Sequence, residues 1–301
     1  MSQDTPPLCD YEGSDYRTAF WEGQGRHYED RTERIALHRL LPPRGKRIAH
    51  LGAGFGRMTN ELDGYEQVIV LDYSRTMLRE AQQVLGRDER LIYVAADIYH
   101  LPLMPGSCDA ALMERVIHHM ADVPAALRQI RQILAPNAPF VLEYANKRNL
   151  KAIVRWLLRR QAWNPFTLEP VEFVALNFDF HPRYMAEQLK AAGFRTERRL
   201  ALSYFRLGAL KRLVPTDILV ALDALLQPTG QLAPFSPSVF TLNRAVGEEP
   251  PAALDGPLFK CVHCGSALER AGERMRCPQG CGAWAIHDGI YDFKENVGAK
   301  R

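Results

Sequence analysis

Short apolar runs alternate with amphipathic segments between residues 47 and 145. Five of these runs have the length and composition of buried strands: 47–52, 66–72, 90–97, 108–114 and 139–145. Between them, apolar residues recur at helical spacing, at Met77, Leu78, Ala81, Val84 and Leu85 and again at Ala126, Leu127, Ile130, Ile133 and Leu134. Alternation of this kind is typical of βαβ units, so the region is predicted to be an α/β domain with a parallel sheet.

Further elements are predicted on both sides of this region. Residues 16–41 have the pattern of a helix that lies against the main domain, and residues 181–193 have that of a helix that ends at Gly193. Strands are predicted at 196–205 and at 238–245. Residues 246–257 are rich in proline and have no amphipathic period, which indicates a linker.

The composition is that of a soluble globular protein. Of the 301 residues, 47% are apolar and 24% are charged, and the formal net charge of +3 is too small to indicate a nucleic-acid partner. The N-terminus has no basic stretch followed by an apolar core, so no signal peptide is expected. No apolar run reaches the length of a membrane span, and we expect a cytoplasmic protein without a transmembrane segment.

A glycine loop follows the first predicted strand. In "HLGAGFGRM", Gly52, Gly54 and Gly56 stand between a strand and a helix, where a tight turn and a close ligand exclude a Cβ atom. A dinucleotide fingerprint, G-x-G-x-x-G, requires its third glycine at position 57, which is Arg57. The spacing G-x-G-x-G therefore makes a nicotinamide dinucleotide a poor candidate.

Two aspartates stand at the ends of the next two strands. Asp72 ends the second strand, where a carboxylate accepts hydrogen bonds from both hydroxyls of a ribose. Asp97 ends the third, where it is placed to accept from an adenine amino group. The carboxyl ends of parallel strands share one edge of the sheet, so these groups should meet the glycine loop. The alternatives are a helix cap near Ser74 for Asp72 and a turn role for Asp97.

Four segments in this order, "HLGAGFGRM", "VLDYSRTML", "ADIYHLPL" and "CDAALMERVIHHM", resemble the class I S-adenosylmethionine-dependent methyltransferases. The resemblance covers about residues 45–145 and is strongest to the type 11 group related to quinone-biosynthesis enzymes. It implies a doubly wound, Rossmann-like sheet of seven strands with 238–245 as the antiparallel last strand. It implies cofactor contacts from Gly52, Ala53, Gly54, Gly56, Asp72, Tyr73, Asp97, Ile98 and Glu114. The alternative is a doubly wound domain that binds another nucleotide or no ligand.

The segment after the fourth strand offers candidates for catalysis. The methyl of a sulfonium is already activated, so such an enzyme supplies alignment and, for some nucleophiles, a base. His118 and His119 are candidate bases near neutral pH, although tandem histidines are also common as polar packing or cap residues. Neither N-P-P-Y nor Pro-Cys occurs there, which disfavours the amino-methylating and cytosine-C5 classes. A small-molecule acceptor is favoured, with RNA or protein as open alternatives.

Residues 146–160 carry six basic and no acidic side chains. Interleaved with them are the apolar residues Leu150, Ile153, Val154, Leu157 and Leu158. Such a helix suits a membrane surface, an anionic substrate or RNA. The interpretation that we favour from the sequence is a solvated face over a buried apolar stripe.

Four of the six cysteines form two tight pairs near the end of the chain. Cys261 and Cys264 are followed, after twelve residues, by Cys277 and Cys281. Two such pairs supply the four thiolates of a tetrahedral Zn²⁺ site, and the metal stabilises a module too small to fold unaided. His263 or His287 is an alternative fourth ligand, and four reduced free thiols are the remaining alternative.

This C-terminal stretch resembles the small zinc-ribbon proteins that activate methyltransferases, which end in a similar "I-x-D-G-I" sequence. The resemblance implies a zinc ribbon that packs on its own methyltransferase domain, for example by adding strands to a sheet edge, and stabilises or activates it in cis. The competing interpretation is a catalytically silent, cofactor-binding scaffold whose ribbon recognises RNA or a protein.

The predicted organisation has four parts. They are an N-terminal helical lid segment at 1–40, the methyltransferase domain at 41–245, a linker at 246–257 and the zinc ribbon at 258–301. Within the lid segment, the aromatic residues Tyr16, Trp21 and Tyr28 are candidates to close over the cofactor, and at least one of them is expected in the core.

Overall fold

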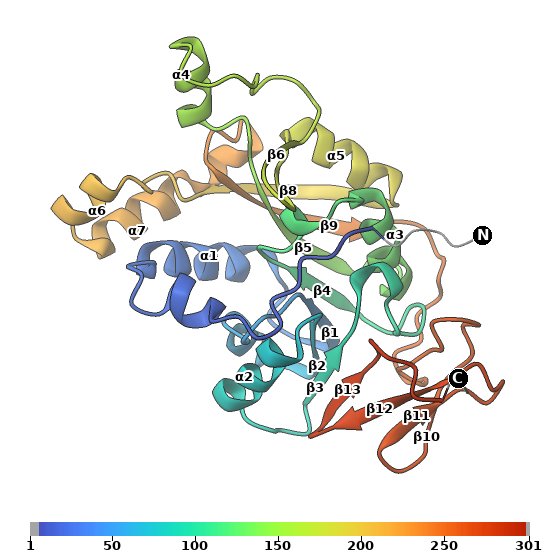
Figure 1. Ribbon diagram of the computed structural model, residues 1–301. Helices are drawn as coiled ribbons and strands as arrows, with labels where there is room; N and C mark the ends of the chain where they lie inside the picture. Colours follow the sequence, from blue (N-terminus) through green and yellow to red (C-terminus); the bar gives the residue numbers. More distant parts are fainter. Residues whose placement is uncertain (1–5, 299–301) are drawn as a thin grey trace.

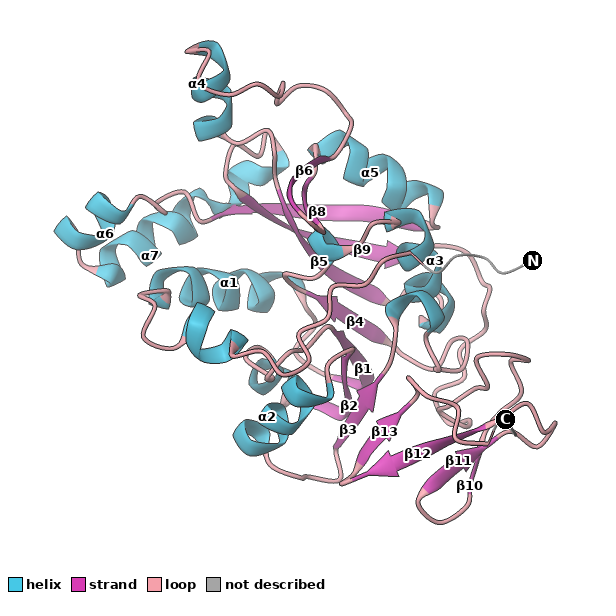
Figure 2. Ribbon diagram, viewed as in Figure 1, coloured by secondary structure: helices cyan, strands magenta, loops and turns pink. Residues whose placement is uncertain are grey.

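The computed structural model describes residues 6–298, so the first five residues of the predicted lid segment and the last three of the predicted ribbon lie outside the described residues. The α-helices (Figure 2) are α1 His27–Leu40, α2 Arg75–Leu85, α3 Val123–Ile133, α4 Leu150–Leu157, α5 Pro182–Ala191, α6 Gly208–Leu213 and α7 Thr216–Leu226. Shorter helical turns are η1 Arg17–Trp21, η2 Thr59–Leu62, η3 Ile98–His100, η4 Ile117–His119 and η5 Gln227–Gln231.

The first nine strands are β1 Gly45–Leu51, β2 Tyr65–Asp72, β3 Leu91–Ala95, β4 Ala110–Met113, β5 Pro139–Ala145, β6 Val171–Val174, β7 Asn177–Asp179, β8 Phe194–Leu202 and β9 Ser238–Ala245. Seven of them form the central sheet, in the order β3-β2-β1-β4-β5-β9-β8, while β6 and β7 pair only with each other. Within this sheet β9 runs antiparallel to both of its neighbours. The prediction of a doubly wound α/β sheet whose 238–245 strand is antiparallel is confirmed.

Helices cover both faces of this sheet (Figure 1). Alternate residues along a strand point to opposite faces, so Ile48 of β1 packs with α1 and α2 while Ala49 packs with α3 and α5. The strands are buried on both sides, which explains why their sequences read as continuous apolar runs. All carboxyl ends of the parallel strands therefore open at one edge, below the N-terminal segment.

The C-terminal module, residues 258–298, extends the same sheet. Its strands are β10 Glu269–Arg270, β11 Arg274–Arg276, β12 Ala283–His287 and β13 Ile290–Asp292. Residues of β13 pair in parallel with β3, and the resulting sheet has 11 strands. Apolar side chains of the module, including Trp284 and Phe293, join the core that contains α3. The expected addition of strands to a sheet edge is what the structure has.

The N-terminal segment departs from the single predicted helix at 16–41. The chain turns between η1 and α1, where Gly23 and Gly25 have φ of 73° and 63°. A helix of L-residues does not continue through such angles, so two glycines split the pattern. Tyr28 belongs to the core, because it is buried and its hydroxyl donates to Asp223 at 2.5 Å.

The interpretation of residues 146–160 as a solvated face over a buried stripe is wrong. In α4 only Ala152 is buried, whereas Leu150, Val154 and Leu157 are 62%, 44% and 65% exposed. The helix projects from the body at the top of Figure 1, where no sheet lies beneath it to bury its apolar side chains. Among residues 6–298, no helix combines the length and the apolar character needed to cross a membrane.

Candidate active site and metal centre

The glycine loop between β1 and η2 requires glycine for steric reasons. Gly52 and Gly54 have φ of 69° and 55°, in the left-handed region. A Cβ atom on Gly52 would lie 2.2 Å from Cγ2 of Val116, so no larger residue fits against the segment after β4. The backbone N–H of Gly54 points toward the end of β2 and donates to Asp72.

Asp72 connects this loop to helix α2. Its carboxylate accepts from the backbone N–H groups of Gly54 and Ser74, each at 2.8 Å. The N-cap residue of α2 is Ser74, whose hydroxyl accepts from the N–H of Met77. Asp72 is therefore not the cap of this helix. Desolvation raises the pKa of Asp72 to about 6, with Asp10 adding to the shift and Lys294 opposing it.

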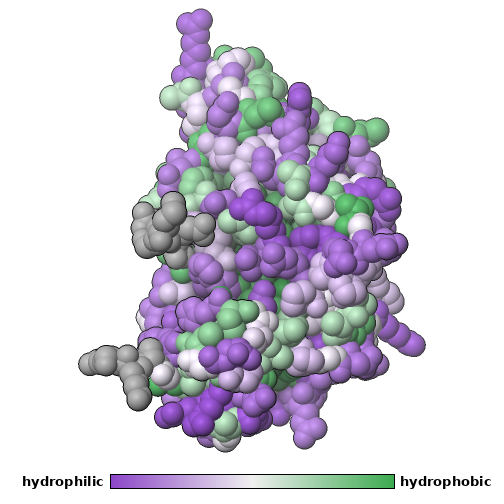
Figure 3. Space-filling view, turned by 90° about the vertical axis from the view of Figure 1, so that its right-hand side faces the viewer, coloured by the Kyte–Doolittle hydropathy of each residue, from purple (hydrophilic) through white to green (hydrophobic). Residues whose placement is uncertain are grey.

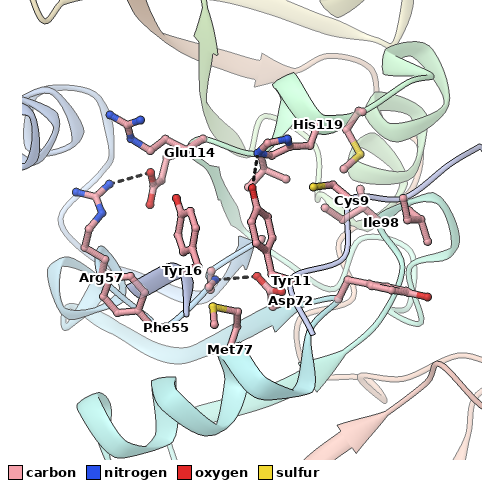
Figure 4. Close-up of a pocket in the computed structure, with 18 of the residues that line it drawn as sticks. Cys9, Tyr11, Tyr16, Phe55, Arg57, Asp72, Met77, Ile98, Glu114 and His119 are labelled. Carbon is pink, nitrogen blue, oxygen red and sulfur yellow. Dashed lines mark hydrogen bonds and ion pairs between the residues drawn. The ribbon is translucent and has the colours of Figure 1, made fainter. Parts of the chain in front are cut away.

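A cavity opens above the loop and is closed by the N-terminal segment (Figure 4). Of the predicted cofactor and catalytic residues, those that line it are Gly52, Ala53, Gly54, Asp72, Tyr73, Ile98, Glu114 and His119. The N-terminal segment contributes Leu8, Cys9, Tyr11, Tyr16 and Trp21. The structure thus brings eight of the predicted site residues together and places two of the three predicted lid aromatics, Tyr16 and Trp21, over them.

Three predicted site residues, Gly56, Asp97 and His118, do not line this cavity. Gly56 lies against α2, where a Cβ atom would meet Leu85 at 2.5 Å. Asp97 accepts from the N–H of Tyr99 and from Nδ1 of His100, both at 2.8 Å, and it faces a crevice between the end of β3 and the C-terminal module. His118 lines an adjoining cavity instead.

A network of buried charges lies at one side of the cavity. The guanidinium of Arg57 donates to Glu33 at 2.7 Å and to Glu114 at 2.9 Å, and Arg115 also donates to Glu33. Burial raises the pKa of Glu114, against the attraction of Arg57. Although burial favours the neutral acid, Arg115 and Arg57 hold the pKa of Glu33 below its ordinary value. The ring of Trp21 lies 3.9 Å from the Arg57 guanidinium and so ties the lid segment to this network.

His119 is held in one tautomer. A carbonyl oxygen only accepts, so the 2.9 Å contact with the Leu176 carbonyl fixes the proton on Nδ1. Nε2 then accepts from the hydroxyl of Tyr11 at 3.2 Å. Burial lowers the pKa of His119, which keeps the ring neutral at neutral pH. The lone pair on Nε2 of a neutral imidazole therefore faces the hydroxyl of Tyr11 at the cavity wall.

A second cavity adjoins the first at Tyr11, Tyr16 and His119. Two buried polar atoms on its walls, Oγ of Ser14 and Nδ1 of His118, have no hydrogen-bond partner among the described residues. Buried polar atoms are normally paired, so these two are suited to bind a polar group of a ligand.

Sequence reasoning missed Tyr11 and the lining residues around it. Tyr11 stands 108 positions from His119, and no motif relates the two. In the sequence, Arg57 is conspicuous only because it breaks the dinucleotide fingerprint. Its ion pairs could not be predicted from neighbouring residues, because its partners come from helix α1 and from the segment after β4.

The four cysteines of the C-terminal module converge. The Sγ atoms of Cys261, Cys264, Cys277 and Cys281 all lie within 4.8 Å of one another, and none is in a disulfide. Zn–S bonds of about 2.3 Å in a tetrahedron require S···S separations of about 3.8 Å, so the four thiols fit Zn²⁺. His263 stacks on Trp284 and neither it nor His287 belongs to the cluster.

Residues 49–142 match the family model described as "Methyltransferase domain", type 11. An uncharacterized chloroplastic methyltransferase of Arabidopsis thaliana is 35% identical over 34% of this chain and 31% of its own length. An O-methyltransferase of Penicillium expansum is 30% identical over 45% of this chain and 52% of its own. A demethylmenaquinone methyltransferase of Corynebacterium kroppenstedtii is 32% identical over 33% of this chain and 41% of its own length. The chain spans between a third and a half of the length of these relatives.

Solved structures share the fold. A structure of a complex between the Haloferax volcanii Trm112 methyltransferase activator and a putative methyltransferase matches 77% of this chain and 98% of its own, with a TM-score of 0.53 and 17% identity. A putative S-adenosylmethionine-dependent methyltransferase from Listeria monocytogenes matches 73% and 99%, with a TM-score of 0.52 and 15% identity. Residues 49–142 therefore match the type 11 methyltransferase family model, and the chain shares the Rossmann-like fold of solved S-adenosylmethionine-dependent methyltransferases.

Proposed function

We propose that this protein transfers a methyl group from S-adenosylmethionine to a small-molecule acceptor. The observation that carries the proposal is the Asp72 carboxylate beside the glycine loop, in a cavity roofed by the protein's own N-terminal segment. The names of two relatives, a demethylmenaquinone methyltransferase and a 27-O-demethylrifamycin SV methyltransferase, support a small acceptor. The six cysteines are all outside disulfides, which supports a reducing cytoplasm.

The residues assigned to the cofactor are Gly52, Ala53, Gly54, Asp72, Tyr73, Ile98 and Glu114. S-adenosylmethionine supplies an electrophilic methyl on a sulfonium. Asp72 keeps acceptor capacity beyond its two backbone contacts and is placed to receive the ribose hydroxyls. We give Gly56 a role in packing the loop on α2, and Asp97 a role in orienting the turn that presents Ile98.

The base that we propose is His119. Its Nε2 takes the proton of an acceptor hydroxyl, either directly or through Tyr11, and its Nδ1–H remains on the Leu176 carbonyl. His118 and Ser14 then hold polar groups of the acceptor in the second cavity. The aromatic residues Tyr11, Tyr16 and Phe20 also line this cavity, which suits a flat acceptor.

We further propose that zinc on the four cysteines supports the site in cis. Asn296 donates to the carbonyl of Cys281 at 3.2 Å. The turn that contains Cys281 is therefore bonded to the segment after β13, which includes Lys294. The ammonium of Lys294 lies 3.9 Å from the ring of Tyr73 and 3.6 Å from Glu12. Glu12 in turn accepts from the N–H of Arg75 at the start of α2. The module thus contacts both the cofactor wall and the lid segment.

The alternative is a catalytically silent scaffold whose ribbon recognises RNA or a protein. Burial of Trp284, Phe259 and Phe293 in the core favours the cis role, because these apolar groups are not free for a partner.

Labelled methyl transfer into cell-extract fractions tests the proposal. We expect label from S-adenosylmethionine to enter small molecules, in a form resistant to RNase and protease. His119→Ala should lower turnover by about 10²-fold or more and leave S-adenosylhomocysteine binding unchanged. Label that is lost on RNase or protease treatment would replace the small acceptor by a macromolecule. Cofactor binding without transfer to any fraction would support the silent scaffold.

A further inference from the structure

Exposed apolar side chains gather mainly in two parts of this molecule, around α4 and along α6 and α7. Within residues 6–298, every exposed large apolar residue except Val84, Val246 and Val297 lies between residues 150 and 235. Those on α4 and in the loops that contact it are Leu150, Val154, Leu157, Leu158, Phe166 and Phe235, which we call the α4 face. Single exposed apolar residues are ordinary, but a gathering of them marks an interaction surface.

Contacts join the parts of the α4 face. The N–H of Leu150 donates to the carbonyl of Phe235 at 2.8 Å, and the Arg148 guanidinium lies 5.5 Å from the Phe235 ring. On the other side of the helix, the ring of Trp156 meets that of Phe166 edge-on at 5.6 Å. The helix and its two flanking loops therefore form one fixed surface rather than separate loose segments.

The same face is basic. Lys147 is buried and donates to Thr167 and Glu169, but the other basic residues of this stretch form no salt bridge with any described residue. They are Arg148, Lys151, Arg155, Arg159 and Arg160. At the top of the molecule, where α4 lies, hydrophilic and hydrophobic side chains stand next to each other in Figure 3. Uncompensated positive charge thus borders the exposed leucines.

We propose that the α4 face docks on an anionic lipid surface. A short helix with leucines on one side and arginines around them lies in the plane of the interface, where its apolar groups enter the acyl boundary and its cations meet the lipid headgroups. RNA pairs with the arginines but leaves Leu157 and Leu158 in water. A second copy of the chain brings like charges together.

This inference does not depend on methyl transfer, but it bears on it. The β6–β7 hairpin follows α4 in the segment between β5 and α5, and its turn contains Leu176, whose carbonyl accepts from Nδ1 of His119. If the proposed function holds, this hairpin links the docked segment to the residue that positions His119.

Flotation of the full chain with vesicles tests the proposal. We expect binding to phosphatidylcholine vesicles that contain phosphatidylserine, little binding to phosphatidylcholine alone, and weaker binding as salt rises. Leu157→Ser with Leu158→Ser should lower binding by about tenfold or more, since both side chains are exposed in the free protein and their loss leaves the fold intact. Arg155→Gln with Arg159→Gln should remove the preference for anionic lipid.

Matched controls lie on other surfaces. Val84→Ser with Val297→Ser changes exposed apolar residues elsewhere, and Arg274→Gln with Arg276→Gln changes exposed arginines of β11. Both should float like the wild type, and all variants should bind S-adenosylhomocysteine equally, which separates this proposal from the enzymatic one. Three results overturn it: no flotation, RNA binding that depends on the arginines but not on the leucines, or a dimer that the leucine substitutions break.

Discussion

At Asp72 a single carboxylate joins the glycine loop to the start of helix α2. Both of its backbone contacts are short, and each fixes the direction of a neighbouring chain segment. Arg57 acts similarly on the other side of the cavity, where it gathers Glu33 and Glu114 into one buried network. Asp72 and Arg57 therefore each join separate chain segments at the edge of the cavity.

Asp72→Asn should weaken binding of S-adenosylhomocysteine. An ionised acceptor contributes about 1.5–3 kcal/mol per hydrogen bond, so we expect a loss of about tenfold or more at pH 7.5. Desolvation raises the pKa of Asp72 to about 6, and the ribose hydroxyls need the ionised form. The affinity of the wild type should therefore be constant above about pH 7 and fall as the pH drops through 6, while the variant lacks this dependence.

Calorimetric titrations from pH 5 to 8 measure this effect. The exposed Asp63 supplies the matched control, and Asp63→Asn should bind like the wild type. Equal affinities of wild type and Asp72→Asn at pH 7.5, with intact melting curves, would remove Asp72 from the cofactor site.

At the scale of elements, the end of β13 is coupled to the lid segment. The three residues after Asp292 include Lys294, whose side chain is only 11% exposed and lies near Asp10, Glu12 and Tyr73. Arg75 at the start of α2 pairs with Asp292 at 2.5 Å from the other direction. Charges from the lid, from α2 and from the C-terminal module thus meet beside the cavity wall at Tyr73.

Lys294→Met should loosen the lid segment. Without the ammonium, Asp10 and Glu12 lose their shared cation, and hydrogen exchange of residues 8–21 should become faster. Affinity for S-adenosylhomocysteine should fall about twofold to fivefold, which corresponds to the roughly 0.4–1 kcal/mol of a partly exposed ion pair. Lys294→Arg should retain most of the affinity, and Lys190→Met on the surface of α5 should have no effect. Removal of zinc with a chelator should speed hydrogen exchange in the same residues as Lys294→Met does. If residues 8–21 stay protected from exchange after both changes, the lid segment is not coupled to the C-terminal module.

At the scale of the whole molecule, the C-terminal module completes a sheet. Pairing of β13 with β3 covers an edge that otherwise presents free N–H and C=O groups. The connecting residues are held to the body as well, because Arg131 donates to the carbonyls of Val246 and Glu249 at 2.7 Å each. The module is therefore continuous with the central sheet and its core in hydrogen bonding and in packing.

Removal of residues 250–301 should destabilise the remainder. The cut exposes the β3 edge and the apolar surface under Phe259 and Phe293, so we expect residues 1–249 to melt at least about 5 °C lower or to aggregate. Residues 256–301 with zinc, added in trans, should restore part of the loss, less effectively than the tethered form. Thermal melts of the two preparations provide the measurement; a truncated chain that melts like the full chain would favour a separate recognition module.

The sequence by itself determined the framework and the chemistry of its loops. The spacing of apolar residues predicted β1 to β5 and helices α2 and α3. This spacing is local, because the buried side of a strand or an amphipathic helix repeats every few residues. The glycine spacing, Asp72 and the four cysteines could also be predicted, because each motif has a characteristic spacing along a short stretch of chain.

Only the tertiary structure decided how distant segments meet. That Tyr11 reaches His119, that Lys294 reaches the lid and that β13 extends β3 depends on packing between residues more than a hundred positions apart, which leaves no local pattern. The stripe of α4 shows the limit most clearly. The spacing of its apolar residues predicted a helix correctly, but such spacing shows only that one face of the helix is apolar. Burial of that face requires another element packed against it, and this fold places none there.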